Sequence, residues 1–195
     1  MRGRVCFMGL GNTDFADDGF GVCLAEALVD AGFENVIVAG ASPERYLGSI
    51  SEGEFDDLIF LDAVEFGGAS GSVVFLNAHE ITTRFPQIST HKMSLAMLAA
   101  LIGADGTRAW LLGVQPESLK VARPLTPAVQ TTLSLVKDLL LEIKRDLHEA
   151  STCAFMRTDG AQPRLFPHCA LASYQRMPIE IGTMRVGSAP VDAYS

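Results

Sequence analysis

The sequence has no surplus of positive charge. Its 195 residues carry 15 Lys and Arg against 23 Asp and Glu, which gives a formal net charge of -8 at pH 7. Proteins that bind nucleic acids or anionic membranes through their general charge need a basic face. We therefore expect neither nucleic acid nor a membrane surface among the partners. A basic or metal-bearing partner fits the charge better.

Paired cysteines and a long apolar leader are also missing. Four cysteines are spread over the chain without a C-x-x-C pair, namely Cys6, Cys23, Cys153 and Cys169. This spacing is typical of reduced or buried thiols rather than of a disulfide framework. The apolar run after the basic N-terminus is short and ends in Gly, Asn and acids, so no export signal or membrane span is predicted. The expected location is the cytoplasm.

Several familiar motifs begin in this sequence but are not completed. Gly9-x-Gly11 begins like a dinucleotide fingerprint, but Asp14 stands where the third glycine belongs, and a carboxylate there repels a pyrophosphate. No Gly-Lys-Ser/Thr follows, which excludes a P-loop. His79 begins an H-E pair, but Thr83 stands where the second histidine of a zinc helix is needed. No motif demands a Ser or Cys nucleophile.

The stretch from residue 9 to residue 21 is rich in glycines and acids. It follows an apolar run and leads into an amphipathic segment, which predicts a strand, a loop and a helix. Asp14, Asp17 and Asp18 repel one another in this loop unless water, a cation or a positive helix end relieves them. A helix N-cap at Asp17 or Asp18 accounts for one acid but not for three.

Short apolar runs alternate with helical patterns along most of the chain. The runs cover residues 5–8, 36–39, 58–61, 73–76 and 110–114. Runs that are apolar throughout are typical of strands covered by helices on both faces. Their order predicts an α/β domain with three layers, α/β/α, and a mixed, mostly parallel five-stranded sheet. The short connection between residues 58–61 and 73–76 allows an antiparallel hairpin.

A helical segment that ends near Gly103 follows the histidine at position 91. Ser89 or Thr90 is its expected N-cap, which places His91 in the first turn. There the helix dipole disfavours the imidazolium, and a neutral imidazole is the form that ligates a metal or accepts a proton. A lone histidine is also commonly a surface or packed residue. The apolar stripe of this helix is expected to consist of Met93, Met97 and Leu101.

The longest helix is predicted to begin at Thr126-Pro127, because a cap and a proline at the first helical position stand in the preferred order. Its apolar face, at steps of four and three, consists of Val129, Leu133, Val136, Leu140, Ile143 and Leu147. This helix is expected to close a domain of residues 1–149. Residues 150–195 lose periodicity and gain prolines, so they are predicted to form a C-terminal tail that is partly disordered.

Asp18, Asp62 and His91 converge on one rim of the predicted sheet. Asp18 follows the first strand, Asp62 ends the third, and His91 begins a helix on the same side. Asp62 alone is also explained as a turn-starting or helix-capping residue. Two carboxylates and an imidazole suit borderline divalent ions such as nickel or zinc, and three protein ligands leave positions open for a substrate group or water.

At these residues the sequence resembles the hydrogenase maturation proteases, which trim the C-terminus of the large subunit of nickel-iron hydrogenases. Four groups of motifs occur in the family's order and spacing and cover about residues 4–146. They are Gly9-Leu-Gly-Asn-Thr with Asp17-Asp18-Gly19-Phe-Gly21, Asp62-Ala63, Thr90-His91-Lys-Met93-Ser-Leu95, and Gly113-Val-Gln115-Pro116. Ala41 and Lys92 depart from the family's pattern. These departures bear on how the substrate fits more than on how the metal is bound.

The resemblance implies a mixed sheet between helices, of the phosphorylase/hydrolase-like kind, and a nickel-dependent endopeptidase of the aspartic-type class. It implies Asp18, Asp62 and His91 as metal ligands, with metal-assisted cleavage and no Ser or Cys nucleophile. The nickel is expected to arrive with the substrate, the precursor of a [NiFe] hydrogenase large subunit, and only the loaded precursor is cut.

Two other functions fit the residues. The first is a maturation chaperone that binds the nickel-loaded precursor without cutting it. The second is an unrelated metal-dependent hydrolase with its own resident ion.

Overall fold

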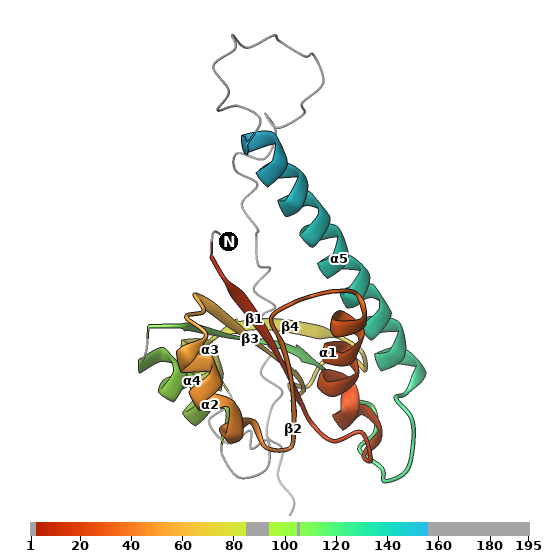
Figure 1. The fold of residues 1–195 in the computed structure, drawn as a ribbon. Helices are drawn as coiled ribbons and strands as arrows, with labels where there is room; N and C mark the ends of the chain where they lie inside the picture. The colour runs from red at the N-terminus through yellow and green to blue at the C-terminus, as the bar shows by residue number, and fades with distance from the viewer. Residues whose placement is uncertain (1–2, 85–93, 105, 156–195) are drawn as a thin grey trace, which may run out of the picture. The chain divides into compact units, whose positions relative to one another are not determined.

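The structure is a computed structural model that describes residues 3–84, 94–104 and 106–155 (Figure 1). The sheet in this part of the chain consists of β1 (Val5–Leu10), β2 (Val36–Gly40), β3 (Asp57–Ala63), β4 (Val73–Asn77) and β5 (Arg108–Val114). Their order is β2-β1-β3-β5-β4. Neighbouring strands are parallel except β4 and β5, which are antiparallel. The predicted mixed, mostly parallel five-stranded sheet is therefore confirmed.

The partner of β4 differs from the predicted hairpin. β4 is antiparallel, but it pairs with β5, with Val74 opposite Gly113. The expected partner, β3, already has β5 alongside it in parallel register, with Asp62 opposite Gly113. The chain therefore passes β4 to the outer side of β5, where it forms one edge of the sheet.

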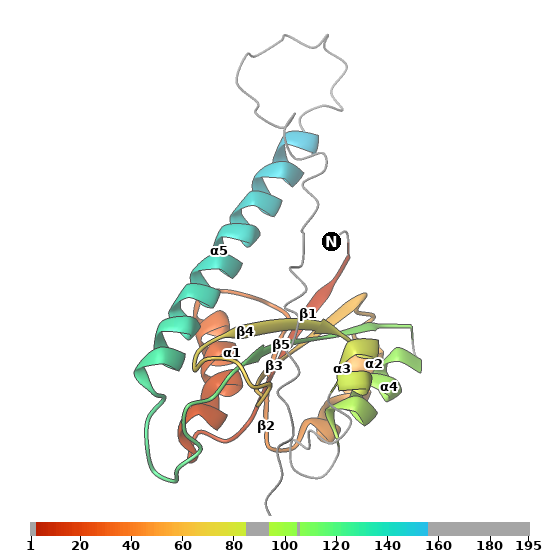
Figure 2. The same cartoon turned by 180° about the vertical axis from the view of Figure 1, so that it is seen from behind.

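Helices cover both faces of the sheet, as predicted (Figures 1 and 2). One face packs against α1 (Phe20–Asp30) and α5 (Pro127–Phe155). The other packs against α2 (Leu47–Glu52), α3 (Ala78–Arg84) and α4 (Leu95–Ala104). Side chains of β3 alternate between the two cores, with Leu58 and Phe60 toward α2–α4 and Ile59 and Leu61 toward α1 and α5.

The start of α4 corrects the predicted N-cap. The helix begins at Leu95, and the hydroxyl of Ser94 accepts a hydrogen bond from the Met97 N–H at 3.2 Å. Ser94 therefore satisfies an N–H of the first turn, as an N-cap does. The described helix thus starts later than expected, and Ser89 and Thr90, the expected N-caps, lie outside the described residues.

The buried face of α4 also differs from the expected stripe. Met97 and Leu101 are exposed, and Met93 lies outside the described residues. The residues that pack into the core are Leu95, Leu98, Ala99 and Ile102. Almost every residue of this helix is apolar, so its sequence contains two possible stripes, and contact with the sheet selects one of them.

The longest helix, α5, begins at Pro127 as predicted and ends at Phe155, beyond the predicted boundary at residue 149. The first part of its apolar face packs as expected, whereas Ile143 and Leu147 are exposed because the helix runs past the sheet (Figure 2). Most of the predicted tail, residues 156–195, lies outside the described residues, so the domain boundary stays a prediction.

Helix α1 lies very close to the strands because its N-terminal turn carries a glycine. A Cβ on Gly21 would overlap the carbonyl oxygen of Leu61 and would lie 2.5 Å from the carbonyl oxygen of Leu10. These carbonyls belong to the carboxyl-end halves of β3 and β1. The contact fixes the beginning of α1 against the edge of the sheet at which Asp18 and Asp62 lie.

The opposite end of β3 is closed by a fully paired acid. Asp57 is buried and accepts hydrogen bonds from Arg108 Nε at 2.8 Å, Arg108 Nη2 at 2.7 Å and Trp110 Nε1 at 2.8 Å. Burial opposes the ionisation of Asp57, but these bonds and the charge of Arg108 outweigh it and lower its pKa below the ordinary value. Ionised Asp57 therefore stabilises the folded chain.

We expect Gly21→Ala to lower the free energy of unfolding by about 2–3 kcal/mol, because the added methyl group has no room between α1 and the strands. Gly48→Ala in α2 is the matched control, since a Cβ there meets no atom within 4 Å. The control should leave stability unchanged or raise it by up to about 1 kcal/mol. Urea unfolding followed by circular dichroism measures both, and equal losses would contradict the close approach.

We expect Asp57→Asn to lower the free energy of unfolding by about 1–3 kcal/mol at pH 7, where the wild-type carboxylate is ionised and bonded. The folded pKa lies below the unfolded one, so this contribution is present above pH 4 or so and is lost as pH falls through the folded pKa. The difference between wild type and variant should shrink in urea titrations toward pH 2. The control is Asp138→Asn at an exposed position, whose difference in stability from wild type should not change with pH. A difference for Asp57→Asn that is equally independent of pH would refute the stabilisation by ionised Asp57.

Candidate functional site

The turn between β1 and α1 is held by Asn12. The Asn12 N–H donates to Asp18 Oδ2 at 2.7 Å, and Asn12 Oδ1 accepts a hydrogen bond from the Asp14 N–H at 2.9 Å. Gly11 has φ 108°, and a Cβ at this position would overlap the carbonyl oxygen of Asp18. Gly11 therefore lets the chain fold back so that the Asp18 carboxylate reaches the end of β1.

The neighbouring acid, Asp17, is buried and forms hydrogen bonds to distant parts of the chain. Its Oδ2 accepts bonds from the N–H groups of Glu117 at 2.8 Å and Ser118 at 3.0 Å. The Thr126 N–H donates to Oδ1 at 2.7 Å, and the Thr126 hydroxyl donates to Oδ2 at 3.0 Å. Asp17 thereby fixes the loop between β5 and α5 to the turn that contains Asp18.

The three acids of this turn therefore have different environments. Asp14 is exposed, Asp17 is buried, and Asp18 is partly buried. The N-cap positions of the short 3-10 helix at Ala16–Gly19 and of α1 are occupied by Phe15 and Gly19, without a side-chain cap. The alternative in which Asp17 or Asp18 caps a helix is wrong, because the Asp17 carboxylate accepts bonds from the loop between β5 and α5 and the Asp18 carboxylate accepts the Asn12 N–H.

Asp62 is a buried carboxyl group in the last part of β3. Its Oδ1 accepts the Ala63 N–H at 2.8 Å, and its Oδ2 is buried without a hydrogen-bond partner among the described residues. Burial, and then the charge of Asp18, raise the pKa of Asp62 well above its ordinary value. The turn-starting or helix-capping interpretation is wrong, because Asp62 lies within the strand opposite Gly113.

The structure thus brings Asp18 and Asp62 together at the carboxyl ends of β1 and β3. His91 lies outside the described residues, so the structure does not test its place in the site. Within residues 3–84, 94–104 and 106–155 there is no group of three His, Cys, Asp or Glu side chains arranged to hold a metal ion. The described part of the site is a pair of carboxylates.

A carboxylate pair of this kind has a defined chemistry. Ionised carboxylates only accept hydrogen bonds, and a buried acceptor without a donor is costly unless the group is protonated or meets a cation. The Oδ2 of Asp62 lies next to the charge of Asp18 and has no partner among the described residues, so either a proton or a cationic ligand would relieve it. Oxygen donors together with an imidazole suit a first-row divalent metal.

Gln115 supports the loop that follows Asp62. Its side-chain oxygen accepts hydrogen bonds from the N–H groups of Phe66 at 2.9 Å and Gly68 at 3.2 Å. Its own N–H donates to the carbonyl of Ser72 at 2.8 Å. The sequence motif includes Gln115 but does not reveal this role, and the role of Asp17 has no local signal either, because its partners are about 100 residues away.

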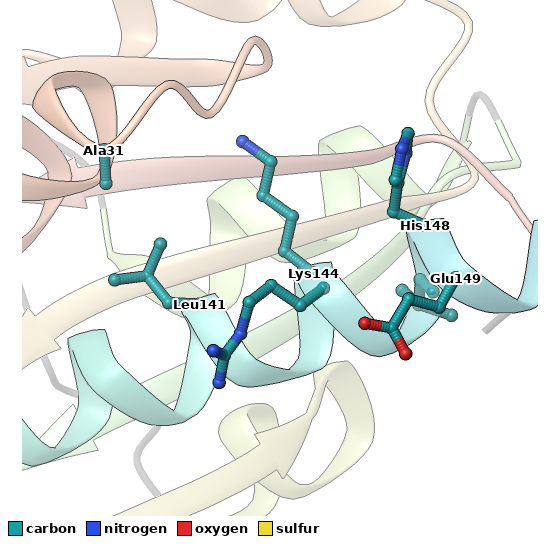
Figure 3. Close-up of a pocket in the computed structure, with 7 residues that line it drawn as sticks. Ala31, Leu141, Lys144, His148 and Glu149 are labelled. Atoms are coloured by element: carbon teal, nitrogen blue, oxygen red, sulfur yellow. The ribbon is translucent and has the colours of Figure 1, made fainter.

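A hollow of about 600 Å³ lies elsewhere, between the end of α1 and the second half of α5 (Figure 3). It is lined by Ala31, Leu141, Lys144, Arg145, Leu147, His148 and Glu149. Lys144 is engaged there, since its Nζ donates to the Gly32 carbonyl at 2.6 Å and lies 4.6 Å from the centre of the Phe33 ring. This contact ties α5 to α1, and the hollow shares no residue with the carboxylate pair.

Comparison with solved structures places this fold among known hydrogenase maturation proteases. The crystal structure of a [NiFe] hydrogenase maturation protease, HycI, from Thermococcus kodakarensis KOD1 matches with a TM-score of 0.65 and 30% identity. The match covers 72% of this chain and 91% of that structure.

Comparison of sequences gives the same relationship. The hydrogenase 2 maturation protease of Escherichia coli (strain K12) is 30% identical over 163 residues, which cover 79% of this chain and 96% of that protein. The hydrogenase expression/formation protein HupD of Rhodobacter capsulatus is 29% identical over 195 residues, covering 94% of this chain and 90% of HupD, so the likeness extends beyond residues 4–146. The family described as hydrogenase maturation protease matches residues 23–143. The chain therefore belongs to the hydrogenase maturation protease family.

Proposed function

We propose that this protein is the endopeptidase that removes a C-terminal peptide from the nickel-loaded precursor of a [NiFe] hydrogenase large subunit. Family membership supports the protease activity and its place in hydrogenase maturation. The observation that supports a particular site is the buried oxygen of Asp62 beside Asp18, which has no hydrogen-bond partner among the residues that the structure describes.

Asp18, Asp62 and His91 are the proposed ligands of the nickel, which belongs to the substrate. The chemistry of the first two supports this, because a cation between them would relieve the repulsion and the desolvation that raise the pKa of Asp62. Nickel bound there would polarise the scissile carbonyl as a Lewis acid. A precursor without nickel gains none of this attraction, so the carboxylate pair selects the loaded precursor.

This chain's own backbone groups hold the two proposed carboxylate ligands in place. Asn12 holds Asp18 in place and the Ala63 N–H holds Asp62, so neither carboxylate needs to reorganise when the precursor binds. Neither described thiol is suited to act as the nucleophile. Burial raises the pKa of Cys6 to about 11, and burial with the nearby charge of Glu26 raises the pKa of Cys23, so both stay protonated near neutral pH.

The two other functions are less well supported. A non-cleaving chaperone is not favoured, because relatives matched over most of their length are named as proteases. The family match also contradicts the hypothesis that the protein is an unrelated metal-dependent hydrolase. We further propose that the protein acts in the cytoplasm as an aspartic-type enzyme. No helix in the described part of the chain is long and apolar enough to cross a membrane.

The proposed activity is tested with a purified large-subunit precursor, incubated with this protein with and without nickel and analysed by intact mass. Loss of a C-terminal peptide only in the nickel-loaded sample is the expected result. Stable binding without a change of mass would replace the protease with the chaperone. A stoichiometric ion in the isolated protein, found by metal analysis, would argue for a resident metal instead of one supplied by the substrate.

We expect Asp62→Asn to reduce cleavage of the nickel-loaded precursor by about 100-fold or more, because removing a ligand charge weakens the attraction for the metal. The variant should remain folded, with a free energy of unfolding at pH 7 equal to or above that of wild type, because a neutral amide replaces a buried unpaired carboxyl. Precursor cleavage and urea unfolding are measured on the same preparation.

Asp14→Asn is the matched control for this experiment. It removes one negative charge from the same edge of the sheet, but Asp14 is exposed and is not a proposed ligand. Cleavage by this control should stay within about twofold of wild type, since a single exposed charge has a small effect. Near wild-type cleavage by Asp62→Asn would exclude Asp62 as a ligand.

A further inference from the structure

Two loops run side by side next to the carboxylate pair. The Ala122 N–H donates to the Asp14 carbonyl at 2.8 Å, and the Asp17 N–H donates to the Ser118 carbonyl at 3.0 Å. The residue numbers increase in one segment while they decrease in the other, so residues 14–17 and 118–122 are antiparallel. The carboxylate of Asp17 reinforces the pairing by accepting the N–H groups of Glu117 and Ser118.

Large apolar side chains are exposed along this pair of segments. Phe15 is 39% exposed, Leu119 is 46% exposed and Val121 is 65% exposed. We refer to these three residues as the apolar rim. Exposed loops normally carry polar residues, so exposed apolar side chains on two loop segments that are hydrogen-bonded to each other are candidates for an interaction site. The apolar rim adjoins the turn that contains Asp18.

The backbone holds the apolar rim in a defined conformation. Ala16 and Ala122, one on each segment, have φ values of 43° and 54°, in the left-handed region that residues other than glycine rarely adopt. Such conformations persist only where surrounding contacts enforce them. Here the hydrogen bonds of Asp17 and the bond between Ala122 and Asp14 do so. The rim is therefore organised before any partner arrives.

We propose that the apolar rim binds an apolar stretch of the precursor polypeptide that flanks its nickel-bearing segment. The proposal rests on the proposed function. A polypeptide that presents a metal to Asp18 has to run over neighbouring residues, and Phe15 is only three positions away in the same turn. A preformed apolar surface there contributes to binding without a large ordering cost. The rim then sets substrate affinity, while the carboxylates act on the metal.

The test uses the full-length double variant L119Q/V121Q, which removes apolar surface from the exposed loop and leaves Phe15 and the site residues intact. We expect KM for the nickel-loaded precursor to rise about tenfold, with kcat within twofold of wild type. The matched control is L135Q/L139Q on α5, where the two leucines are 65% and 56% exposed. The control should leave KM within twofold of wild type.

An unchanged KM in L119Q/V121Q would overturn the proposal, and so would an equal rise in the control or a fall in kcat alone. A change from dimer to monomer in size-exclusion chromatography, with KM unchanged, would assign the rim to a second copy of this chain. If wild type does not cut the precursor, the proposed function fails on its own. In that case the dissociation constant of the nickel-loaded precursor is compared between wild type and L119Q/V121Q in place of KM. Absence of binding to wild type would also refute the proposed role of the apolar rim.

Discussion

The buried carboxylate of Asp17 is the interaction on which the carboxyl edge of the sheet depends. It joins the turn after β1, to which it belongs, to both ends of the loop between β5 and α5, because it accepts bonds from Glu117, Ser118 and Thr126. Hydrogen bonds to a charged group are each worth about 1.5–3 kcal/mol. With its own charge satisfied, Asp17 holds the backbone of the adjacent Asp18 and the loop before α5 in fixed positions.

The buried acids near the two ends of β3, Asp57 and Asp62, have opposite environments. Asp57 at the beginning of the strand is matched by Arg108 and Trp110, and its pKa is lowered. Asp62 near the end of the strand has one bonded oxygen and one without a partner in the described chain, and its pKa is raised. The first arrangement stabilises the fold, and the second keeps a group under-satisfied at the proposed metal site.

Local patterns in the sequence are sufficient to predict the strands and the positions of Asp18 and Asp62. Apolar runs mark buried strands, and parallel strands bring their carboxyl ends to one edge of the sheet. Local patterns fail where distant contacts decide. The neighbour of β4 depends on the position of β5, and the buried face of α4 depends on contacts that choose between two apolar stripes. The partners of Asp17 are equally remote in sequence, so local patterns suggest no role for it beyond the alternative of a helix cap.

The unpartnered oxygen of Asp62 also has an evolutionary consequence. A group that lowers the stability of the isolated protein persists only if selection acts on the reaction as well as on the fold. Variants chosen solely for heat resistance would tend to lose this carboxyl group, whereas, under the proposed role of Asp62 as a ligand, variants chosen for a working hydrogenase would retain it. Under the same proposed role, drift at this single position would separate a lineage that still matures a hydrogenase from one that has kept only the scaffold.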